Sequence, residues 1–443
     1  MRWTFILLAL LWSLPAGAAR NPRVLAAAEV AQLASLPPRG SVTLSDFPDG
    51  QGYRTRIHFQ RIEVHAADAR VVVVAADGEH VLAPSARVQL IGSDDSGSVR
   101  VHLAFGPGFT EVAGSGSSPS GNFVLAADGN ALRARPSEEA LPHGVTLHEP
   151  ATGDAIPHPF APPVPLLPLG DATAAAPVTA RVAVDVDREL LVNRFGGTGS
   201  AGVTAANDWI ADLFGTMNLM YQRDLAVTLQ IGTVIMRTSG TPYAIKRDVA
   251  ADRADLDSFG NYWEANHGNV PRAFAMLLSG QMTSGNSASG IAWLNSYCRK
   301  TSYGGSYSVN KVFTNPGVAL DASARIVGHE LGHNFGANHT HCSSAATGQG
   351  PVSTGTIDPC YKAEPGCWNG PVSCPTAGPG APRGTVMSYC HMAAPNGANC
   401  GANVQQFHPR HVALLSTYVA QNTPACLAPA GGSAVIFRNG FER

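Results

Sequence analysis

The chain has few charged side chains and no large excess of one sign. Asp, Glu, Lys and Arg make up 14% of its 443 residues, and the formal net charge is -2. Domains that bind nucleic acid usually carry a basic stripe or patch, and none occurs in this sequence. We therefore expect no nucleic-acid partner. The hydrophobic fraction of 44% is enough for a substantial core, and the length predicts two or three domains.

Long apolar runs are lacking beyond the N-terminus, where no segment approaches the roughly 18 residues that a transmembrane helix needs. At the N-terminus, Arg2 precedes an apolar stretch from Trp3 to Leu14, and the small residues 16–18 fit a cleavage site. We predict a signal peptide over residues 1–18 and export of a mature chain without a transmembrane segment. A hydrophobic anchor is the alternative, which the shortness of the stretch disfavours.

Cysteine is absent from the first two thirds of the chain. All eight cysteines lie between Cys298 and Cys426. In an exported chain this predicts a local disulfide framework, whose pairing the sequence alone leaves open. A cysteine metal site is the alternative, but Cys360, Cys367 and Cys374 are spaced too widely for the usual C-x-x-C arrangement.

The sequence pattern before residues 151–180 differs from the pattern after them. Residues 40–135 alternate polar and apolar positions and predict a small, mostly antiparallel β unit, within a β-rich N-terminal region of residues 19–150. Residues 151–180 are rich in proline and alanine, which predicts an extended linker accessible to proteases. Its position makes residues 19–150 a candidate prodomain. The alternative is a retained β domain that binds substrate.

Residues 181–426 alternate strand-like and helix-like segments, which predicts an α/β domain with a mixed, mostly parallel sheet. Strands are expected at 181–187, 226–236, 272–280 and 290–298, and helices at 204–224, 255–268, 321–336 and 408–421. Asp321 or Ser323 is the expected cap of the third helix. Residues 340–403 show little regular pattern and predict a long loop region held by disulfides. Residues 427–443 form a C-terminal tail.

Histidines gather in "IVGHELGHNFGANHTHC", residues 326–342. On a helix, His329 and His333 lie one turn apart on the same face, where both imidazoles can bind one zinc ion. Glu330 follows the first histidine and lies beside the metal, as a general base must.

A third ligand requires the chain to turn back. His339 lies ten positions after His329, so a continuous helix would carry it about 15 Å away. Gly336 stands where the helix must end, since glycine accepts the left-handed conformation of helix ends. Gly332 lies inside the helix at a cost of about 1 kcal/mol against alanine, for which we expect close packing to be the reason.

Residues 329–339, "HELGHNFGANH", resemble the H-E-x-x-H-x-x-G-x-x-H motif of metzincin zinc proteases. "GTVMSYC" (384–390) is similar to the methionine turn of that clan, with Met387 as the methionine. "LLSGQMTSGNSASGIAWLNSYC" (277–298) resembles the edge strand that pairs with extended substrate in the reprolysin (adamalysin-like) family. The resemblance covers roughly residues 180–426. It implies a metzincin-like catalytic domain with a long zinc-binding helix.

The chain departs from the reprolysin pattern at two positions. Reprolysins usually carry an aspartate after the third histidine, where this chain has Thr340. Tyr389, two residues after the methionine, is instead a feature of astacins and serralysins, where it stabilises the oxyanion. Tyr389 is therefore either a packed aromatic, the more common case, or a catalytic residue.

The resemblance also bears on latency and on the disulfides. Many reprolysins are kept latent by an upstream cysteine on zinc, but no cysteine precedes Cys298. Latency must then come from steric cover or from another ligand, such as an aspartate or a histidine. The resemblance implies a Cys298–Cys426 disulfide, with the other cysteines stapling the loops of residues 340–400.

The leading hypothesis is a secreted zinc endopeptidase of bacterial type, monomeric, that acts on protein or peptide substrates. Its one catalytic zinc ion would be held by His329, His333 and His339, with Glu330 as general base; calcium is not predicted. His341 is expected to be a loop histidine, with the lesser role of alternative ligand, and His391, His408 and His411 to be surface or satisfied histidines. The alternatives are an inactive zinc-binding adhesion protein, which intact Glu330 argues against, and a zinc hydrolase acting on another substrate, which the edge strand disfavours.

Overall fold

The computed structural model describes residues 27–49, 54–109, 111–128, 131–140, 145–147, 153–157, 176–350, 352, 355–378 and 381–430. The predicted signal peptide, residues 158–175 of the predicted linker and residues 431–443 of the predicted tail lie outside these ranges. Within them, no helix is both long and apolar enough to cross a membrane.

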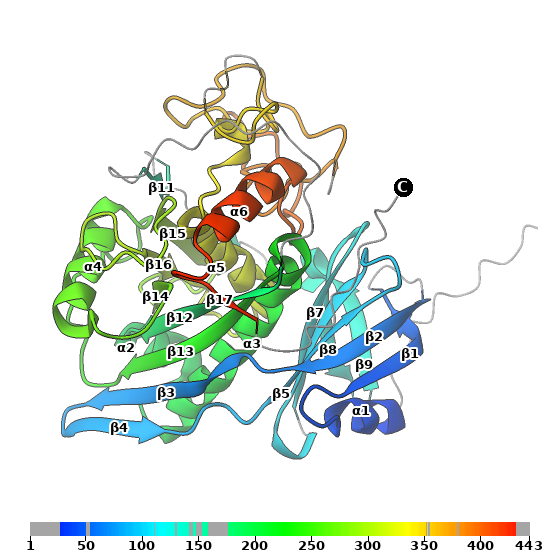
Figure 1. Ribbon diagram of the computed structural model, residues 1–443, viewed down its shortest axis with the longest axis vertical. Coiled ribbons are helices and arrows are strands. Elements are labelled where there is room, and N and C mark those ends of the chain that lie inside the picture. Colours follow the sequence, from blue (N-terminus) through cyan, green and yellow to red (C-terminus); the bar gives the residue numbers. More distant parts are fainter. Residues whose placement is uncertain are drawn as a thin grey trace, which may run out of the picture.

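The N-terminal region contains an antiparallel sheet against which helix α1 (Ala27–Ala34) packs (Figure 1). Alternation of apolar and polar residues places the buried aromatic side chains of Phe47, Phe59, Phe105 and Phe123 in its core. The strands follow the order β1-β2-β5-β6-β7-β8-β9. They are β1 (Ser41–Pro48), β2 (Arg54–Ile62), β5 (Val88–Ser93), β6 (Arg100–Phe105), β7 (Val112–Ser118), β8 (Gly121–Asp128) and β9 (Ala131–Pro136).

The second sheet is mixed, as predicted. Its order is β10-β15-β16-β14-β12-β13-β3-β4, with β11 also on β15 and β17 on β12. Parallel pairing joins β3, β13, β12, β14 and β16, whereas β15 runs antiparallel to β16. The strands are β3 (His65–Ala75), β4 (Gly78–Leu82), β10 (Thr146–Leu147), β11 (Ala155–Ile156), β12 (Val178–Val186), β13 (Val227–Arg237), β14 (Phe274–Ser279), β15 (Ser287–Trp293), β16 (Tyr307–Lys311) and β17 (Ala428–Pro429).

The β3–β4 hairpin departs from the predicted single β unit of residues 40–135. It leaves the first sheet and extends the second one beyond β13. The reason is the β-branched run of residues 71–74, which is apolar on both faces and therefore needs cover on both. Val71 and Val73 pack into the main core on one face, and Val74 packs into a second core on the other.

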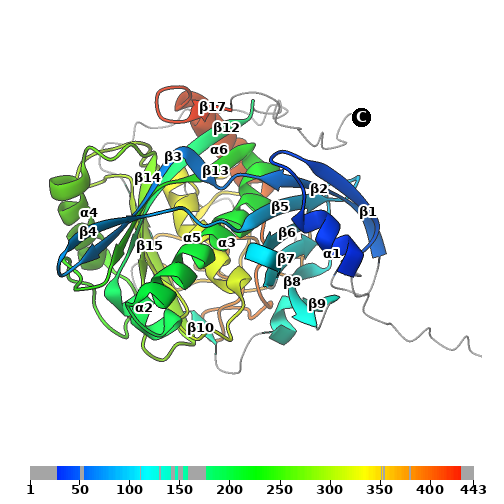
Figure 2. The same ribbon diagram turned by 90° about the horizontal axis from the view of Figure 1, so that it is seen from below.

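Helices cover both faces of the second sheet. Helices α3 (Ser200–Leu225) and α5 (Leu320–Phe335) pack on one face with α2 (Arg188–Phe195) and α6 (Pro409–Gln421), and α4 (Arg253–His267) packs on the other. Helix α3 also contacts β5, β6 and β7, so it lies between the two sheets (Figure 2). Short 3-10 turns occur at η1 (Pro107–Phe109), η2 (Ser137–Ala140) and η3 (Thr340–Cys342).

The cap predicted for the zinc-motif helix is wrong. Its N-cap is Ala319, which makes no side-chain capping bond. Asp321 lies inside the helix and accepts a hydrogen bond from Arg325 at 2.7 Å, while Ser323 is buried. The missing side-chain cap leaves this helix to be held by packing.

All eight cysteines form disulfides. Cys298–Cys426 joins the segment after β15 to the segment after α6, as the family resemblance implies. The other bridges are Cys342–Cys367, Cys360–Cys390 and Cys374–Cys400, all within the predicted loop region. That region contains η3 as its one helical turn among the described residues.

Candidate metal centre and active site

Helix α5 and the turn that ends it bring the three predicted ligands together. His329 and His333 lie one turn apart, and Gly336 ends the helix in the left-handed conformation, with φ 109°. The amide of Ala337 donates to the carbonyl of Gly332 at 3.0 Å, which closes the turn. The His339 ring then lies 4.8 Å from the His333 ring and 5.3 Å from the His329 ring, centroid to centroid.

Each of the three imidazoles is fixed in one tautomer by an acceptor on its Nδ1 side. His329 Nδ1 donates to the carbonyl of Val386 and His333 Nδ1 donates to the carbonyl of Ala337, both at 2.7 Å. His339 Nδ1 donates to Glu364 Oε2 at 2.6 Å. Since these partners accept hydrogen bonds, the Nε2 atom of each ring keeps a lone pair when the ring is neutral, which is the state in which an imidazole binds a metal.

The Nε2 atoms converge on a common point, which the carboxylate of Asp154 also approaches. The Nε2 atoms of His329 and His333 are 3.0 Å apart. Asp154 contacts His339 Nε2 directly and lies 3.1 Å from His333 Nε2 and 3.4 Å from His329 Nε2. Four buried acceptors this close together repel one another unless a cation lies between them. Three imidazoles and one carboxylate are a donor set that suits zinc.

The charge of Asp154 depends on a positive partner. Burial acts to raise the pKa of its carboxyl group, but interaction with the three histidines in their protonated form outweighs burial and holds the pKa well below its usual value. A metal cation between the same groups would act in the same direction. The carboxylate is therefore charged where it meets the histidines. Gly153, just before it, has φ 78°, and a β-carbon there would lie 2.5 Å from Glu364 Oε1. Glycine thus allows the backbone to approach this close.

Glu330 projects from the same helix toward the edge strand β15. It is buried and lines the cavity described below. A β-carbon on Gly290 of β15 would lie 2.2 Å from Glu330 Oε1. The carboxylate therefore occupies space that only a glycine at position 290 leaves open.

The turn around Met387 packs under the helix. A β-carbon on Gly332 would lie 2.7 Å from Met387 Sδ, so close packing accounts for the glycine inside the helix. The amide of Thr340 donates to the carbonyl of Met387 at 3.0 Å. Thr340 Oγ1 donates to Ser388 Oγ at 2.9 Å, and Ser388 Oγ donates to Asp358 Oδ2 at 2.7 Å. An aspartate from the loop thus reaches the methionine turn in a chain that lacks the usual aspartate at position 340.

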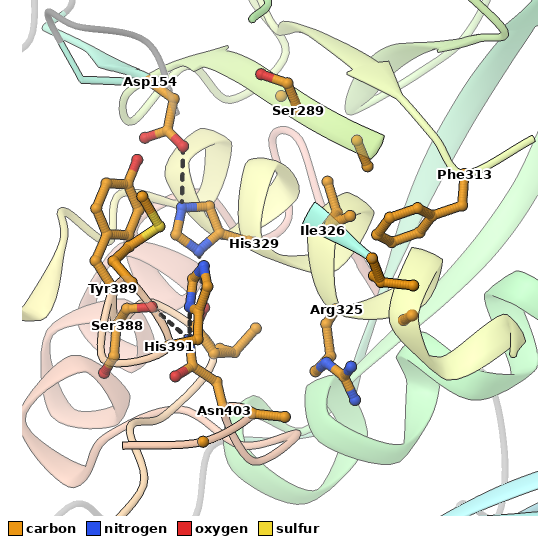
Figure 3. A pocket seen from close by; sticks show the side chains of 18 of the residues that line it. Asp154, Ser289, Phe313, Arg325, Ile326, His329, Ser388, Tyr389, His391 and Asn403 are labelled. Atoms are coloured by element: carbon orange, nitrogen blue, oxygen red, sulfur yellow. Dashed lines mark hydrogen bonds and ion pairs between the residues drawn. The ribbon is translucent and has the colours of Figure 1, made fainter. Parts of the chain in front are cut away.

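A cavity of about 530 Å³ opens beside His329 and Glu330. Tyr389 stands on its wall with the ring 4.3 Å from that of His339, and His391 lies next along it (Figure 3). Ala288, Phe313, Ala322 and Ile326 make the other end apolar. His391, expected to be a surface or satisfied histidine, lines this cavity, and burial lowers its pKa to about 4. By contrast, His408 caps α6 and His411 is buried against Ser343.

The segment that carries Asp154 also occupies the edge of β15. β10 pairs with β15 in parallel at Thr146–Ser287, and β11 pairs with it at Ala155–Ala292. Val145 packs against the apolar end of the cavity. Residues 145–147 and 153–157 therefore cover both the strand edge and the histidine cluster.

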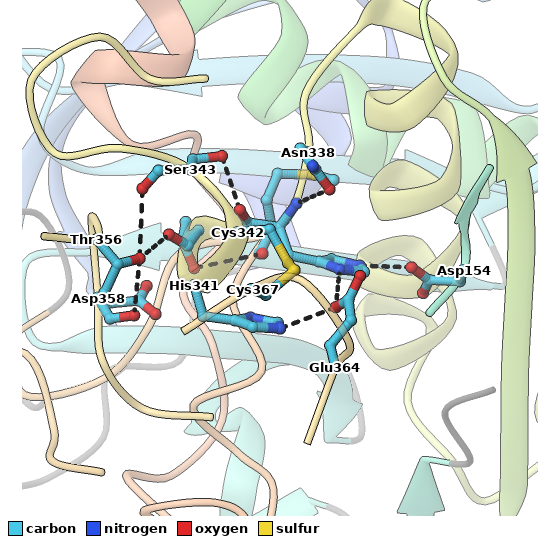
Figure 4. Close-up of a disulfide and its surroundings, with 12 residues drawn as sticks. Asp154, Asn338, His341, Cys342, Ser343, Thr356, Asp358, Glu364 and Cys367 are labelled. Atoms are coloured by element: carbon cyan, nitrogen blue, oxygen red, sulfur yellow. Dashed lines mark hydrogen bonds and ion pairs between the residues drawn. A yellow bond between two sulfur atoms is a disulfide. The ribbon is translucent and has the colours of Figure 1, made fainter. Parts of the chain in front are cut away.

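Glu364 joins two histidines on the far side of the cluster. Its Oε2 accepts from His339 Nδ1 at 2.6 Å and from His341 Nε2 at 2.8 Å (Figure 4). Burial acts to raise the pKa of Glu364, but interaction with the two histidines outweighs it and lowers the pKa to about 2. His341 points its Nε2 to this carboxylate and so takes no part in the cluster around Asp154.

The family model for metallopeptidase family M12, of the reprolysin type, matches residues 176–399, just over half of the chain. The chain belongs to metallopeptidase family M12. No curated protein matches this M12 metallopeptidase. A solved structure, metalloproteinase-II from Bacteroides fragilis, is similar over 69% of this chain and 87% of that chain, with 12% identity and a TM-score of 0.32.

Sequence reasoning missed two carboxylates of the M12 metallopeptidase site. Asp154 lies 175 positions before His329. Glu364 lies 25 positions after His339. The absence of an upstream cysteine pointed to another residue, such as an aspartate, in its place. Nothing in the sequence singled out Glu364.

Proposed function

We propose that this M12 metallopeptidase is an exported zinc endopeptidase that is made as a latent precursor. His329, His333 and His339 hold one zinc ion, and Glu330 is the general base. The observation that carries the proposal is the convergence of three Nε2 lone pairs, each set by an acceptor on the opposite ring nitrogen. Export is supported by the apolar N-terminus and by four disulfides, which persist in oxidising surroundings.

In the proposed reaction, zinc supplies a Lewis acid that lowers the pKa of water toward about 7. Glu330 accepts the proton of the attacking water on its carboxylate and delivers it to the amine nitrogen of the leaving peptide. Gly290 and the helix hold that carboxylate beside the reacting carbonyl. The edge of β15 aligns an extended peptide by main-chain hydrogen bonds, and the apolar end of the cavity receives a side chain.

Latency is the second part of the proposal. Residues 145–147 and 153–157 use the same strand edge that a substrate needs, and Asp154 reaches the three histidines that would hold the zinc ion. The uncut chain is thus blocked by its own N-terminal region, which acts as a prodomain. Cleavage in the linker begins activation. This assigns to Asp154 the part that an upstream cysteine plays in many reprolysins.

The test of the catalytic part compares Glu330→Gln and His339→Ala with the wild-type chain after cleavage of the linker and removal of the segment that carries Asp154. We expect Glu330→Gln to keep its zinc and lose about 10²–10⁴-fold in casein hydrolysis, because proton transfer is lost. His339→Ala is expected to lose both zinc and activity. Zinc content is measured by atomic absorption, and a chelator should abolish wild-type activity. Wild-type hydrolysis by Glu330→Gln would show that another group is the base.

The test of latency compares uncut Asp154→Ala with uncut wild-type protein. We expect its initial rate on a peptide substrate to be at least about tenfold higher, because the carboxylate no longer occupies the point on which the three Nε2 atoms converge. Asp77→Ala, an exposed aspartate elsewhere in the N-terminal region, is the matched control. Equal rates for all three uncut proteins would refute the role of Asp154 and leave the catalytic part standing.

A further inference from the structure

Glu364 is the one side-chain partner among the Nδ1 acceptors of the three zinc-site histidines. His329 and His333 donate to backbone carbonyls, whose positions the helix and the methionine turn set. His339 lies past the end of the helix, where no regular element fixes its ring. Its Nδ1 donates instead to a carboxylate, 10% exposed, at 2.6 Å. A charged acceptor makes a shorter and stronger hydrogen bond than a neutral one and raises the basicity of the imidazole.

His341 is the second hydrogen-bond donor to that carboxylate. Its Nε2 donates to the same Glu364 Oε2 at 2.8 Å, and its side chain is fully buried. The His339 and His341 rings are stacked with centroids 5.2 Å apart and planes at 4°. Tyr361 and Tyr389 pack on the His341 ring. Two stacked imidazoles on alternate residues therefore donate to one oxygen of the carboxylate, which restricts the position of Glu364.

A disulfide joins the two halves of this arrangement. Cys342 follows His341 directly, and Cys367 lies three residues after Glu364. The Cys342–Cys367 bridge thus holds the loop that carries the carboxylate against the turn that carries the histidines, as Figure 4 shows. The amide of Cys367 also donates to the carbonyl of Glu364 at 3.3 Å. The bridge Cys374–Cys400 lies in the same loop region but joins no segment that carries Glu364, His339 or His341.

We propose that Glu364 is a positioning residue that fixes His339 for zinc binding, and that His341 and the Cys342–Cys367 disulfide hold Glu364 in place. The inference rests on the proposed function, because it takes the three histidines as the zinc ligands. It adds a coupling between disulfide formation and metal affinity. The site has its full zinc affinity only when the Cys342–Cys367 disulfide is present.

The experiment measures the zinc dissociation constant of the full chain by competition with a chromophoric chelator, and the visible spectrum after cobalt substitution. We expect Glu364→Ala to weaken zinc binding about 10–100-fold and to change the cobalt spectrum. Glu364→Gln keeps one acceptor oxygen of the same shape and should recover part of the loss. Lys362→Ala, exposed in the same loop, is the matched control and should bind zinc as the wild type does.

The disulfide part uses two paired substitutions. Cys342→Ala with Cys367→Ala is expected to weaken zinc binding about as much as Glu364→Ala. Cys374→Ala with Cys400→Ala should leave it unchanged. Zinc affinity at the wild-type value in folded Glu364→Gln and Glu364→Ala would overturn the proposal, even if their thermal stability fell. Activity is tested separately, after cleavage of the linker and removal of the segment that carries Asp154. A wild-type protein that binds zinc but cleaves no peptide in that state would refute the proposed function and leave the affinity comparison valid.

Discussion

At the scale of single residues, Gly290 decides where the proposed base can stand. A β-carbon at this position would lie 2.2 Å from Glu330 Oε1 and 2.4 Å from its Cδ and Cγ. We expect Gly290→Ala to displace the carboxylate and lower kcat by about 10²-fold or more, with zinc content unchanged. Gly240→Ala, where the added carbon meets no atom within 4 Å, is the control. Steady-state kinetics with zinc analysis checks this, and an unchanged kcat would show that Glu330 has room to move.

The candidate ligands could be predicted from the sequence because their geometry is local. Helical spacing sets His329 and His333, and one glycine turn sets His339, all within residues 329–339. Asp154 and Glu364 could not be predicted, because each reaches the cluster from a distant segment without regular spacing. His391 is a satisfied histidine, as expected, since it is hydrogen-bonded to Asn403, but the sequence could not show that it lines the cavity, because tertiary packing forms that cavity.

At the scale of elements, most helices and strands of residues 181–426 follow their hydrophobic period. The strand predicted at 290–298 runs instead from Ser287 to Trp293, because Asn295 and Cys298 take positive φ angles and end it. The short strand β16 (Tyr307–Lys311) and helix α2 (Arg188–Phe195) were not predicted, because each is too short to show a period. Strand β3 was predicted as a strand but assigned to the other sheet. Its run of valines indicates a strand that is buried on both faces, but the sequence does not show which of the two sheets it joins.

The contact between β6 and α3 carries a pH dependence. His102 of β6 bonds Gln89 at 2.6 Å and Thr216 of α3 at 3.0 Å. Burial, helped by the charge of Arg87, lowers its pKa from 6.5 to about 3. The unfolded chain therefore binds a proton that the folded chain refuses. The contribution of His102 to stability is complete above pH 6.5 and is lost as pH falls toward 3.

Asp212 of α3, beside this contact, acts in the opposite direction. Burial raises its pKa from 3.8 to about 6, against the charge of Arg87 and the hydrogen bond from Gln89. It therefore adds stability as pH falls from about 6 toward 3.8, so only a variant at His102 isolates the first effect.

The free energy of unfolding of the wild type should decrease when the pH is lowered from 7 to 5. In His102→Asn we expect this decrease to be smaller by about 2 kcal/mol, because the buried imidazole is gone. Urea titrations at the two pH values measure this difference, with exposed His80→Asn as control. A fall of the same size in His102→Asn and wild type would contradict the assignment.

At the scale of the whole molecule, the N-terminal region contributes strands β3 and β4 to the second sheet, which carries the candidate site. Strand β3 pairs with β13 from Thr233–Arg70 to Arg237–Val74, and Asp68 accepts from Arg181 of β12 at 2.7 Å. Burial of Val71 and Val73 stabilises this contact by about 1.5–3 kcal/mol each. We expect a chain cut once in residues 158–175 to stay together. Size-exclusion chromatography should show both fragments in one peak, and separate elution of the C-terminal fragment would contradict this.

In the proposed latent precursor, the β3–β4 hairpin determines how the blocking segment leaves the site. After one linker cut, Asp154 remains covalently attached to the N-terminal fragment, which pairs with the second sheet through β3. The carboxylate then meets the histidines at an effective concentration on the order of millimolar, whatever the dilution of the sample. A second cut, between the hairpin-bearing domain and residue 154, turns the blocking segment into a short free peptide that dilution removes.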